Sequence, residues 1–260
     1  MALTTTKGAN VQRFADHRLE ALYVLDFGQF DVGPGKRQIG IPGFLARTNR
    51  KAHLLIDTGF DPLYASAPDE VAARDGLDGF GRLVGHSAAR TVPGQLALLG
   101  LTPGDIDGCI LTHGHIDHAG GLPLLTCPLW LGAAEAARPA PIWWNGRSPW
   151  TWPAGLEMLP VSTQTRLCHG LTLIPTPGHT PGHLSVLAEL PDGRAMILAA
   201  DAINRRSEPD EGFPDADDPA EAARSAEDLM RLRDQTGATL IYGHDPAQWP
   251  MLPKAPELWA

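Results

Sequence analysis

The sequence predicts a protein of the α/β or α+β class, in which a mixed β-sheet is covered by helices. Three observations support this prediction: aliphatic and β-branched runs of strand length recur along the chain, helical patterns lie between them, and a hairpin signal joins two of the runs. Strands interspersed with helices argue against an all-β barrel. The chain has 260 residues, of which 43% are apolar, so it can bury one sizeable core and we expect a single domain over residues 1–260.

Strand-like runs make up most of the predicted structure. They are expected at Glu20–Phe27, Phe44–Thr48, Ala52–Asp57, Cys109–Thr112, Leu129–Gly132, Leu171–Pro175, Leu184–Glu189, Ala195–Ala200 and Thr239–Tyr242. Pro191-Asp192-Gly193 separates two of these runs, and Asp and Gly accept the positive φ angles of a tight turn. The runs on either side of this turn are therefore predicted to be antiparallel.

Two helices and two irregular stretches complete the prediction. The clearer helix covers Pro219–Thr236, because Asp218 can cap its N-terminus, proline suits the first helical position and Gly237 can end it. A second helix is expected over Pro93–Leu99. Residues 138–155, rich in Pro and Trp, and residues 204–218, rich in acids and Pro, are predicted to be surface loops.

The composition excludes several kinds of partner. The formal net charge is -9 and no basic run occurs, so we expect no nucleic-acid partner. No apolar stretch is long enough for a signal peptide or a membrane span, so we expect no membrane partner. Three scattered cysteines fit a reducing compartment, and we expect a soluble, cytoplasmic protein. The sequence leaves the oligomeric state open.

The strongest chemical signal is the motif His113-Gly114-His115-Ile116-Asp117-His118, which directly follows an apolar strand-like run. Residues two apart in an extended segment point the same way, so His113 and His115 can bind one metal ion together. As the chain turns out of the strand, Asp117 and His118 move to an adjacent face and can serve a second ion. The motif therefore predicts metal ligation.

Three more ligand candidates follow other strand-like runs, which would hold them at rigid sheet edges. They are His179, Asp201 and His244. Imidazole and carboxylate are ligands that zinc accepts, and the anionic Asp201 could bridge two cations that repel one another. We therefore expect a site for two Zn²⁺ ions, with other divalent transition metals left open.

These segments, together with Ile56-Asp57-Thr58-Gly59, resemble the metallo-β-lactamase superfamily over nearly the whole chain. The resemblance implies an αββα sandwich of two mixed sheets flanked by helices. It also implies a division of the ligands: His113, His115 and His179 hold one metal, Asp117, His118 and His244 hold the other, and Asp201 bridges both.

An internal symmetry supports this interpretation. Leu55-Ile56-Asp57 matches Ala199-Ala200-Asp201, and Leu111-Thr112-His113 matches Tyr242-Gly243-His244. The matches predict two similar halves that face each other across the site.

Within the superfamily, the chain is most similar to the N-acyl homoserine lactonases and their pyridoxolactonase relatives. The similar segments are residues 115–121, the repeat of residues 176–183, and Asp201-Ala202. Imidazole at His115 favours zinc hydrolysis over diiron redox members, which carry Glu there. The short stretch after His244 disfavours the glyoxalase II thioesterase, and the lack of an export signal disfavours a secreted β-lactamase.

The resemblance implies hydrolysis of a lactone or ester, with a metal-bridging hydroxide that attacks the carbonyl and Asp117 passing a proton to the leaving alkoxide. The lactonases place a Tyr three residues after the bridging Asp, where this chain has Asn204. The Asn204 amide could donate a hydrogen bond to the oxyanion, or Asn204 could be a plain loop residue. Asp57 could orient a ligand His or only cap its own turn, and His183 could support the ligands or pack in the core.

Substrate recognition is predicted for the segment 142–152, which holds four of the seven tryptophans. Large aromatic side chains in an irregular segment need an apolar partner, which could be a substrate, a neighbouring subunit or the protein's own core. We expect Trp144 and Trp150 to belong to a substrate-binding wall beside the metals.

The expected function is therefore a lactonase that acts on a small molecule such as an N-acyl homoserine lactone, a quorum-quenching activity. Two alternatives stay open. One is another hydrolase of the same fold, acting on a phosphotriester, aryl ester or thioester. The other is a weakly catalytic, metal-bound sensor of a small molecule.

Overall fold

The structure is a computed structural model that describes residues 13–33, 37–77, 80–143, 148 and 151–259. Its strands form two sheets, of which the first has seven strands in the order β4-β1-β2-β3-β5-β6-β7. These strands are β1 (Leu19–Asp31), β2 (Gln38–Thr48), β3 (His53–Ile56), β4 (Arg82–Val84), β5 (Gly108–Ile110), β6 (Leu129–Gly132) and β7 (Met158–Val161). Neighbours from β4 to β3 are antiparallel and those from β3 to β7 are parallel, so the sheet is mixed.

The second sheet has five strands in the order β12-β11-β10-β9-β8. They are β8 (Thr165–Cys168), β9 (Leu171–Pro175), β10 (Leu184–Glu189), β11 (Ala195–Ala200) and β12 (Thr239–Tyr242). The β10–β11 hairpin is antiparallel, as the turn at Asp192 predicts, whereas β11 and β12 are parallel. This sheet is therefore mixed as well.

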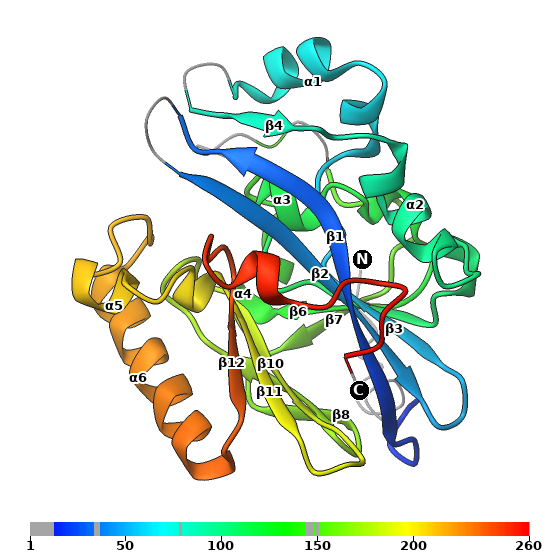
Figure 1. The fold of residues 1–260 in the computed structure, drawn as a ribbon, viewed down its shortest axis with the longest axis vertical. Coiled ribbons are helices and arrows are strands. Elements are labelled where there is room, and N and C mark those ends of the chain that lie inside the picture. Colours follow the sequence, from blue (N-terminus) through cyan, green and yellow to red (C-terminus); the bar gives the residue numbers. More distant parts are fainter. Residues whose placement is uncertain (1–12, 34–36, 78–79, 144–147, 149–150, 260) are drawn as a thin grey trace, which may run out of the picture.

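Helices cover the outer faces of both sheets (Figure 1). The α-helices are α1 (Pro68–Asp75), α2 (Val92–Ala97), α3 (Ile116–Ala119), α4 (Ala133–Ala136), α5 (Glu208–Glu211) and α6 (Pro219–Thr236). Short 3₁₀ turns are η1 (Pro62–Ala65), η2 (Ala88–Arg90), η3 (Pro103–Asp105), η4 (Leu122–Leu124), η5 (Asp201–Ile203) and η6 (Trp249–Met251). Figure 1 shows α6 beside β12, with α1 and α2 at the opposite side of the molecule.

Three hydrophobic clusters separate these layers. The first packs Leu25 and Phe27 of β1 against Val71 of α1 and Leu96 of α2. The second lies between the sheets, the third between the second sheet and α6. Alternate residues of β11 serve the two clusters that flank it: Met196 and Leu198 face the first sheet, Ile197 and Ala199 face α6. The αββα sandwich that the resemblance implies is confirmed.

The strands that the sequence did not predict are all sheet edges. β4 and β7 end the first sheet and β8 ends the second. An edge strand pairs with a neighbour on one side only, so it tolerates polar residues and proline, such as Pro160 in β7. The hydrophobic pattern of these three strands is therefore weak.

Several predicted boundaries need correction. Helix α6 has the predicted bounds and cap, but α2 covers Val92–Ala97 because Thr91 caps it one residue earlier. Helix α1 was not predicted. The stretch 204–218 is not a plain surface loop, since it contains α5 and the buried residues Asn204, Glu208 and Phe213.

The internal symmetry of the sequence reappears in the strand pairing. β3 and β5 are parallel neighbours that end before Asp57 and His113, while β11 and β12 are parallel neighbours that end before Asp201 and His244. The backbone has a positive φ at or next to both aspartates: φ is 58° at Asp57 itself and 47° at Ala200, which precedes Asp201. The two halves thus place an Asp and a His at matching strand ends.

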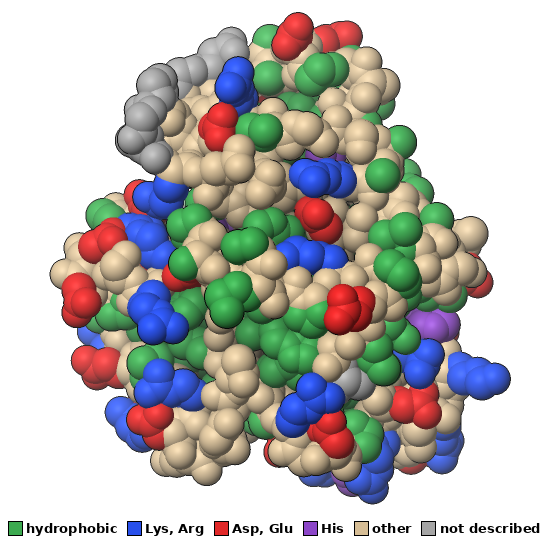
Figure 2. All heavy atoms as spheres, in the orientation of Figure 1, with side chains coloured by type: hydrophobic (Ala, Val, Ile, Leu, Met, Phe, Trp, Pro, Cys, Tyr) green, Lys and Arg blue, Asp and Glu red, His purple; other side chains and the backbone are tan. Residues whose placement is uncertain are grey.

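Figure 2 shows acidic and basic side chains interspersed over one face of the molecule, among the residues that are coloured. Hydrophobic side chains gather toward its centre. Within the described residues, no helix is long and apolar enough to cross a membrane.

Candidate metal centre

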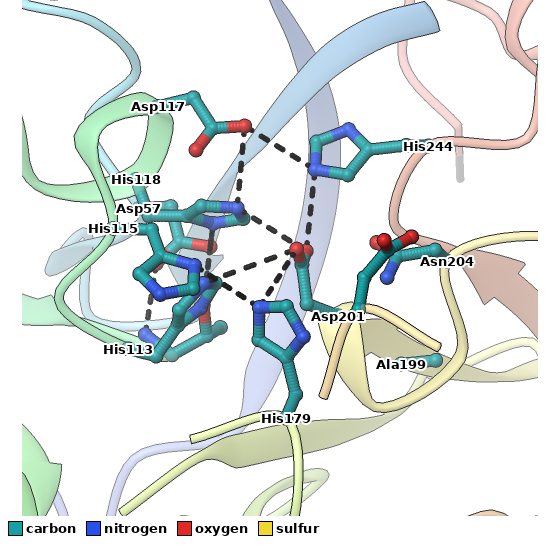
Figure 3. Close-up of polar contacts among 12 residues, drawn as sticks. Asp57, His113, His115, Asp117, His118, His179, Ala199, Asp201, Asn204 and His244 are labelled. Carbon is teal, nitrogen blue, oxygen red and sulfur yellow. Dashed lines mark hydrogen bonds and ion pairs between the residues drawn. The ribbon is translucent and has the colours of Figure 1, made fainter. Parts of the chain in front are cut away.

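The seven predicted metal ligands lie together at one end of the sandwich, between the two sheets (Figure 3). The first sheet supplies four of them from the segment that follows β5: His113, His115, Asp117 and His118. The second sheet supplies the others from the segments that follow β9, β11 and β12: His179, Asp201 and His244. Because strand ends are rigid, the sandwich holds these side chains in place.

The side chains fall into two groups that each suit one metal ion. His113, His115, His179 and Asp201 form one group, and Asp117, His118 and His244 form the other. Within each group the potential ligand atoms all lie within 4.8 Å of one another. Nitrogen and oxygen donors in such numbers are typical of a zinc-type site.

Asp201 lies between the groups and offers one carboxylate oxygen to each (Figure 3). Its Oδ2 is 3.3 Å from His179 Nε2 and 3.9 Å from His113 Nε2. Its Oδ1 is 3.2 Å from the Nε2 atoms of both His118 and His244. This is the arrangement that a bridging carboxylate requires.

Several buried polar atoms of the site lack a hydrogen-bond partner among the described residues. They are His113 Nε2, His118 Nε2 and Asp201 Oδ1. An unsatisfied buried polar atom is costly, and natural structures contain few of them. A cation that accepts these three lone pairs would remove that cost, so the residues fit a metal.

The three histidines of the first group are neutral imidazoles. Burial lowers the pKa of His113 well below its usual value, and the neighbouring His118 and His115 lower it further. Burial likewise lowers the pKa of His115, and it lowers that of His179 to about 3. All three side chains are therefore uncharged at neutral pH, and His179 Nε2 and His115 Nδ1 share a hydrogen bond of 3.0 Å.

The second group stabilises positive charge. Burial opposes protonation of His244, but Asp201 and Asp117 outweigh it and raise its pKa to about 10. The pKa of His118 is also raised, against burial, by Asp117, Asp201 and Asp57. Burial would raise the pKa of Asp117, yet His118 and His244 hold it at about 2. This group therefore favours a cation over an empty, uncharged state.

Hydrogen bonds from neighbouring segments orient two of the imidazoles. His118 Nδ1 lies 2.8 Å from Asp57 Oδ2, and the same carboxylate accepts hydrogen bonds from the backbone N–H and hydroxyl of Thr112. His244 Nδ1 donates to the carbonyl of Gly40 in β2 at 2.8 Å. Gly40 can have no side chain, because a Cβ there would lie 2.1 Å from the Trp249 ring. Each contact leaves Nε2 free to face the metal site.

His183 lies behind Asp201 and is buried. Its Nε2 accepts the backbone N–H of Asp201 at 3.1 Å, and its Nδ1 lies 2.8 Å from the hydroxyl of Thr176. Both ring nitrogens are thus occupied within the protein, and the structure places His183 beside the ligands rather than among them.

A cavity of about 340 Å³ opens over the metal ligands. Its polar floor is formed by His115, Asp117, His179, Asp201, Asn204 and His244. Its apolar wall is formed by Phe30, Val32, Ile39, Phe60, Leu77, Phe80, Ile116 and Trp143. The charged side chains Arg37 and Asp215 also line it and lie 4.0 Å apart. The cavity can hold an apolar chain with its polar end at the ligands.

Asn204 lies in this floor and is bound to Glu208. Its Nδ2 donates to Glu208 Oε1 at 3.2 Å, and its backbone N–H donates to the other oxygen of the same carboxylate. Asn204 Oδ1 is buried and has no hydrogen-bond partner among the described residues. One N–H of the Asn204 amide is therefore engaged with Glu208, and Oδ1 is left as an acceptor.

The predicted aromatic wall is only partly visible. Trp144 and Trp150 lie outside the described residues. Their neighbour Trp143 is fully buried, belongs to the hydrophobic cluster beneath α1 and α2, and lines the cavity. The other wall residues, such as Phe30 and Phe60, were not predicted, because they come from segments far apart in the sequence.

Comparisons with known sequences agree with this site. The family profile described as "Metallo-beta-lactamase superfamily" matches residues 43–244. An N-acyl homoserine lactonase AttM of Rhizobium radiobacter is 31% identical over 182 residues, which are 64% of this chain and 68% of that protein. Metallo-beta-lactamase domain-containing protein 1 of Homo sapiens is 31% identical over 166 residues, 62% of this chain and 56% of that protein.

Solved structures agree with the fold. An N-acyl homoserine lactone hydrolase with N-hexanoyl-L-homoserine bound at its catalytic metal centre has a TM-score of 0.79 and 22% identity, covering 93% of this chain and 99% of that one. AidC, a dizinc quorum-quenching lactonase, has a TM-score of 0.59 and 16% identity, covering 94% and 96%. At these identities the likeness establishes the fold alone.

Proposed function

Since this chain belongs to the metallo-beta-lactamase superfamily, we propose that it is a dinuclear metal-dependent hydrolase of lactones, with N-acyl homoserine lactones as its substrate class. Three relatives that are 31% identical over 181 or 182 residues are named N-acyl homoserine lactonase AttM. Fold and family do not determine the reaction, which depends on the residues of the site.

The position of Asp201 carries the proposal. A carboxylate with one oxygen toward each of two ligand groups, at the floor of a cavity, is what a two-metal hydrolase needs. We propose that His113, His115 and His179 hold one ion, that Asp117, His118 and His244 hold the other, and that Asp201 bridges them. Bound there, two divalent ions would supply an activated water and an electrophile for a carbonyl oxygen.

Asp117 is proposed to move the proton. It lines the cavity, and its Oδ2 lies 3.3 Å from His244 Nε2. Because its pKa is held at about 2, Asp117 starts ionised and must first take the proton that the attacking water loses. It can then pass this proton to the leaving alkoxide as the ring opens.

The cavity walls suit an acylated substrate. The apolar wall around Phe30, Phe60 and Trp143 would bind an acyl chain by burying its surface. Asn204 is proposed to contact the substrate through its unpaired Oδ1, which can accept a hydrogen bond from an amide N–H such as the one beside a homoserine lactone ring. Trp144 and Trp150 are proposed to extend the apolar wall.

Zinc is the proposed metal, because most of the candidate ligands are imidazoles and the rest are carboxylates. Hydrolysis of N-acyl homoserine lactones would make the protein a quorum-quenching enzyme. The three cysteines are buried and unpaired, which supports the proposed cytoplasmic location.

A substrate panel tests the proposal. The zinc-loaded protein is given N-hexanoyl and N-decanoyl homoserine lactone, an aryl ester, a thioester and a phosphotriester, and each product is measured by mass spectrometry. We expect ring opening of the lactones to have the highest kcat/KM and to be lost in the chelator-treated protein. Faster turnover of any other member would replace the lactonase assignment, and stoichiometric lactone binding without turnover would favour a sensor.

A further inference from the structure

We propose that Thr176, Ser185 and His183 are positioning residues that together hold the backbone on both sides of Ala200, and so aim the carboxylate of Asp201 between the two ligand groups. The inference deepens the proposed function, because it rests on the metal-bridging role of Asp201. Thr176, Ser185 and His183 are not among the seven candidate metal ligands. They form a hydrogen-bond network of their own within the second sheet.

This hydrogen-bond network is continuous from the end of β9 through β10 to β11. Asp201 N–H donates to His183 Nε2 at 3.1 Å, and His183 Nδ1 lies 2.8 Å from Thr176 Oγ1. Thr176 Oγ1 lies 2.9 Å from Ser185 Oγ, which donates to the carbonyl of Ala199 at 2.9 Å. All of these side chains are at most 2% exposed, so water does not compete for their hydrogen bonds.

The position of every proton in this network is determined from both ends. At one end, the Asp201 N–H can only donate, so His183 Nε2 must be unprotonated and its Nδ1 must carry the proton. At the other end, the Ala199 carbonyl can only accept, so Ser185 donates to it and Thr176 must donate to Ser185. Thr176 then has to accept from His183 Nδ1–H, which is the result reached from the first end.

The residue enclosed by this network has a strained backbone. Ala200 has φ 47° and ψ -137°, a region that residues with a side chain rarely adopt. Such a conformation is strained and persists only where its surroundings impose it. Here the Ala199 carbonyl before it and the Asp201 N–H after it are both held, by Ser185 and His183.

The strain has a geometric consequence for the metal site. Ala200 is the last residue of β11, and its turn directs the next residue, Asp201, toward the first sheet's His113 and His118. If the hydrogen-bond network is broken, Ala200 can relax and the Asp201 carboxylate loses its fixed direction. Ligand misplacement of this kind weakens metal binding without removing any ligand.

The first test measures the tautomer of His183 in the full-length protein by ¹⁵N NMR, with and without zinc. We expect the neutral form protonated at Nδ1 at neutral pH in both states. A proton on Nε2, or a doubly protonated ring, would overturn the proposal. This measurement needs neither metal nor turnover, so it separates failure of this inference from failure of the proposed function.

The second test compares two isosteric substitutions in the same loop, Thr176→Val and Thr180→Val. Both threonines are buried, but the Thr180 hydroxyl has no hydrogen-bond partner among the described residues, so it is the matched control. By competition with a chelator, Thr176→Val should weaken metal binding by about 10- to 100-fold, whereas Thr180→Val should match the unchanged protein. Thr176→Ser, which keeps the hydroxyl, should restore binding.

Equal metal affinities in Thr176→Val and Thr180→Val would contradict the proposal. If Thr176→Val does not fold, the His183 tautomer and the metal affinity of Thr176→Ser still test the proposal. Thr176→Ser should bind metal more tightly than Ser185→Ala, which lacks the Ser185 hydroxyl. Equal metal affinities in these two variants would also contradict the proposal. If the tautomer is as expected but the protein holds fewer than two metals, the two-metal function fails instead.

Discussion

Asp57 Oδ2 lies 2.8 Å from His118 Nδ1, in a buried contact between residues 61 positions apart in the sequence. The same carboxylate receives the backbone N–H and the hydroxyl of Thr112. With these donors in place, the Asp57 carboxylate accepts from Nδ1–H of His118, and this contact directs His118 Nε2 toward Asp201 and Asp117.

Replacing Asp57 with Asn should therefore weaken the second metal position. An Asn amide can present either a donor or an acceptor to His118, so the ring loses its fixed orientation. We expect the metal affinity of the second position to fall by about 10- to 100-fold, measured by chelator competition. Asp75→Asn is the control for burial, since Asp75 is as buried but binds Tyr64 and Arg74 instead. Equal loss in both variants would mean that Asp57 only supports the fold.

The purified protein should contain close to two equivalents of metal, and Asp201→Ala should lower occupancy at both positions because one oxygen of Asp201 faces each group. Elemental analysis after expression in zinc-supplemented medium measures this. Glu20→Gln, an exposed change far from the site, is the control. Loss of one metal only would show that Asp201 is a ligand to a single ion.

Metal affinity should depend strongly on pH at the second position and hardly at all at the first. His244, with its pKa raised to about 10, and His118, with its pKa also raised, are protonated at neutral pH without metal, so a metal must displace these protons. His113, His115 and His179 have lowered pKa values and are already unprotonated. Between roughly pH 6 and pH 9, affinity at the second position should rise with pH, while affinity at the first stays nearly constant.

Calorimetry in two buffers of different ionisation enthalpy counts the protons released with each metal. We expect about two at the second position and close to none at the first. The same number at both positions would contradict the assignment of the two groups.

Asp117→Asn should reduce turnover more than substrate affinity. Asparagine can remain in the ligand group but cannot carry the proton to the alkoxide, a step that matters only in the transition state. We expect kcat to fall by about 100-fold or more with KM little changed, in steady-state assays on a zinc-loaded protein whose metal content is checked in parallel. A variant that keeps both metals and full kcat would assign the proton transfer to another group.

The tryptophans of residues 142–152 should divide into two kinds. Trp143 is fully buried, so Trp143→Ala should destabilise the protein by about 3–5 kcal/mol, measured by urea unfolding. Trp144→Ala and Trp150→Ala should instead raise KM for long-chain lactones with an unchanged melting temperature, as expected for side chains that bind the substrate. Large losses of stability in these two variants would make them core residues as well.

Much of this architecture could be predicted from local patterns. Central strands such as β10 and β11 and helix α6 have the predicted bounds, because hydrophobic periodicity and capping residues are properties of consecutive residues. The edge strands β4, β7 and β8 and the short helices other than α2 were missed, since few apolar residues mark them in the sequence. The bend at Ala200 is also invisible there, because alanine gives no sign of a positive φ.

The sequence by itself predicted all seven candidate ligands, because each is a metal-binding residue type that follows the end of a strand-like run, and strand ends are readable from local pattern. Only the tertiary structure decided how these residues combine. Gly40 and His244 are 204 positions apart, yet the carbonyl of one orients the ring of the other. The aromatic wall likewise joins Phe30, Phe60 and Trp143. Such contacts depend on how two sheets pack, which is a non-local property that no single segment of the chain encodes.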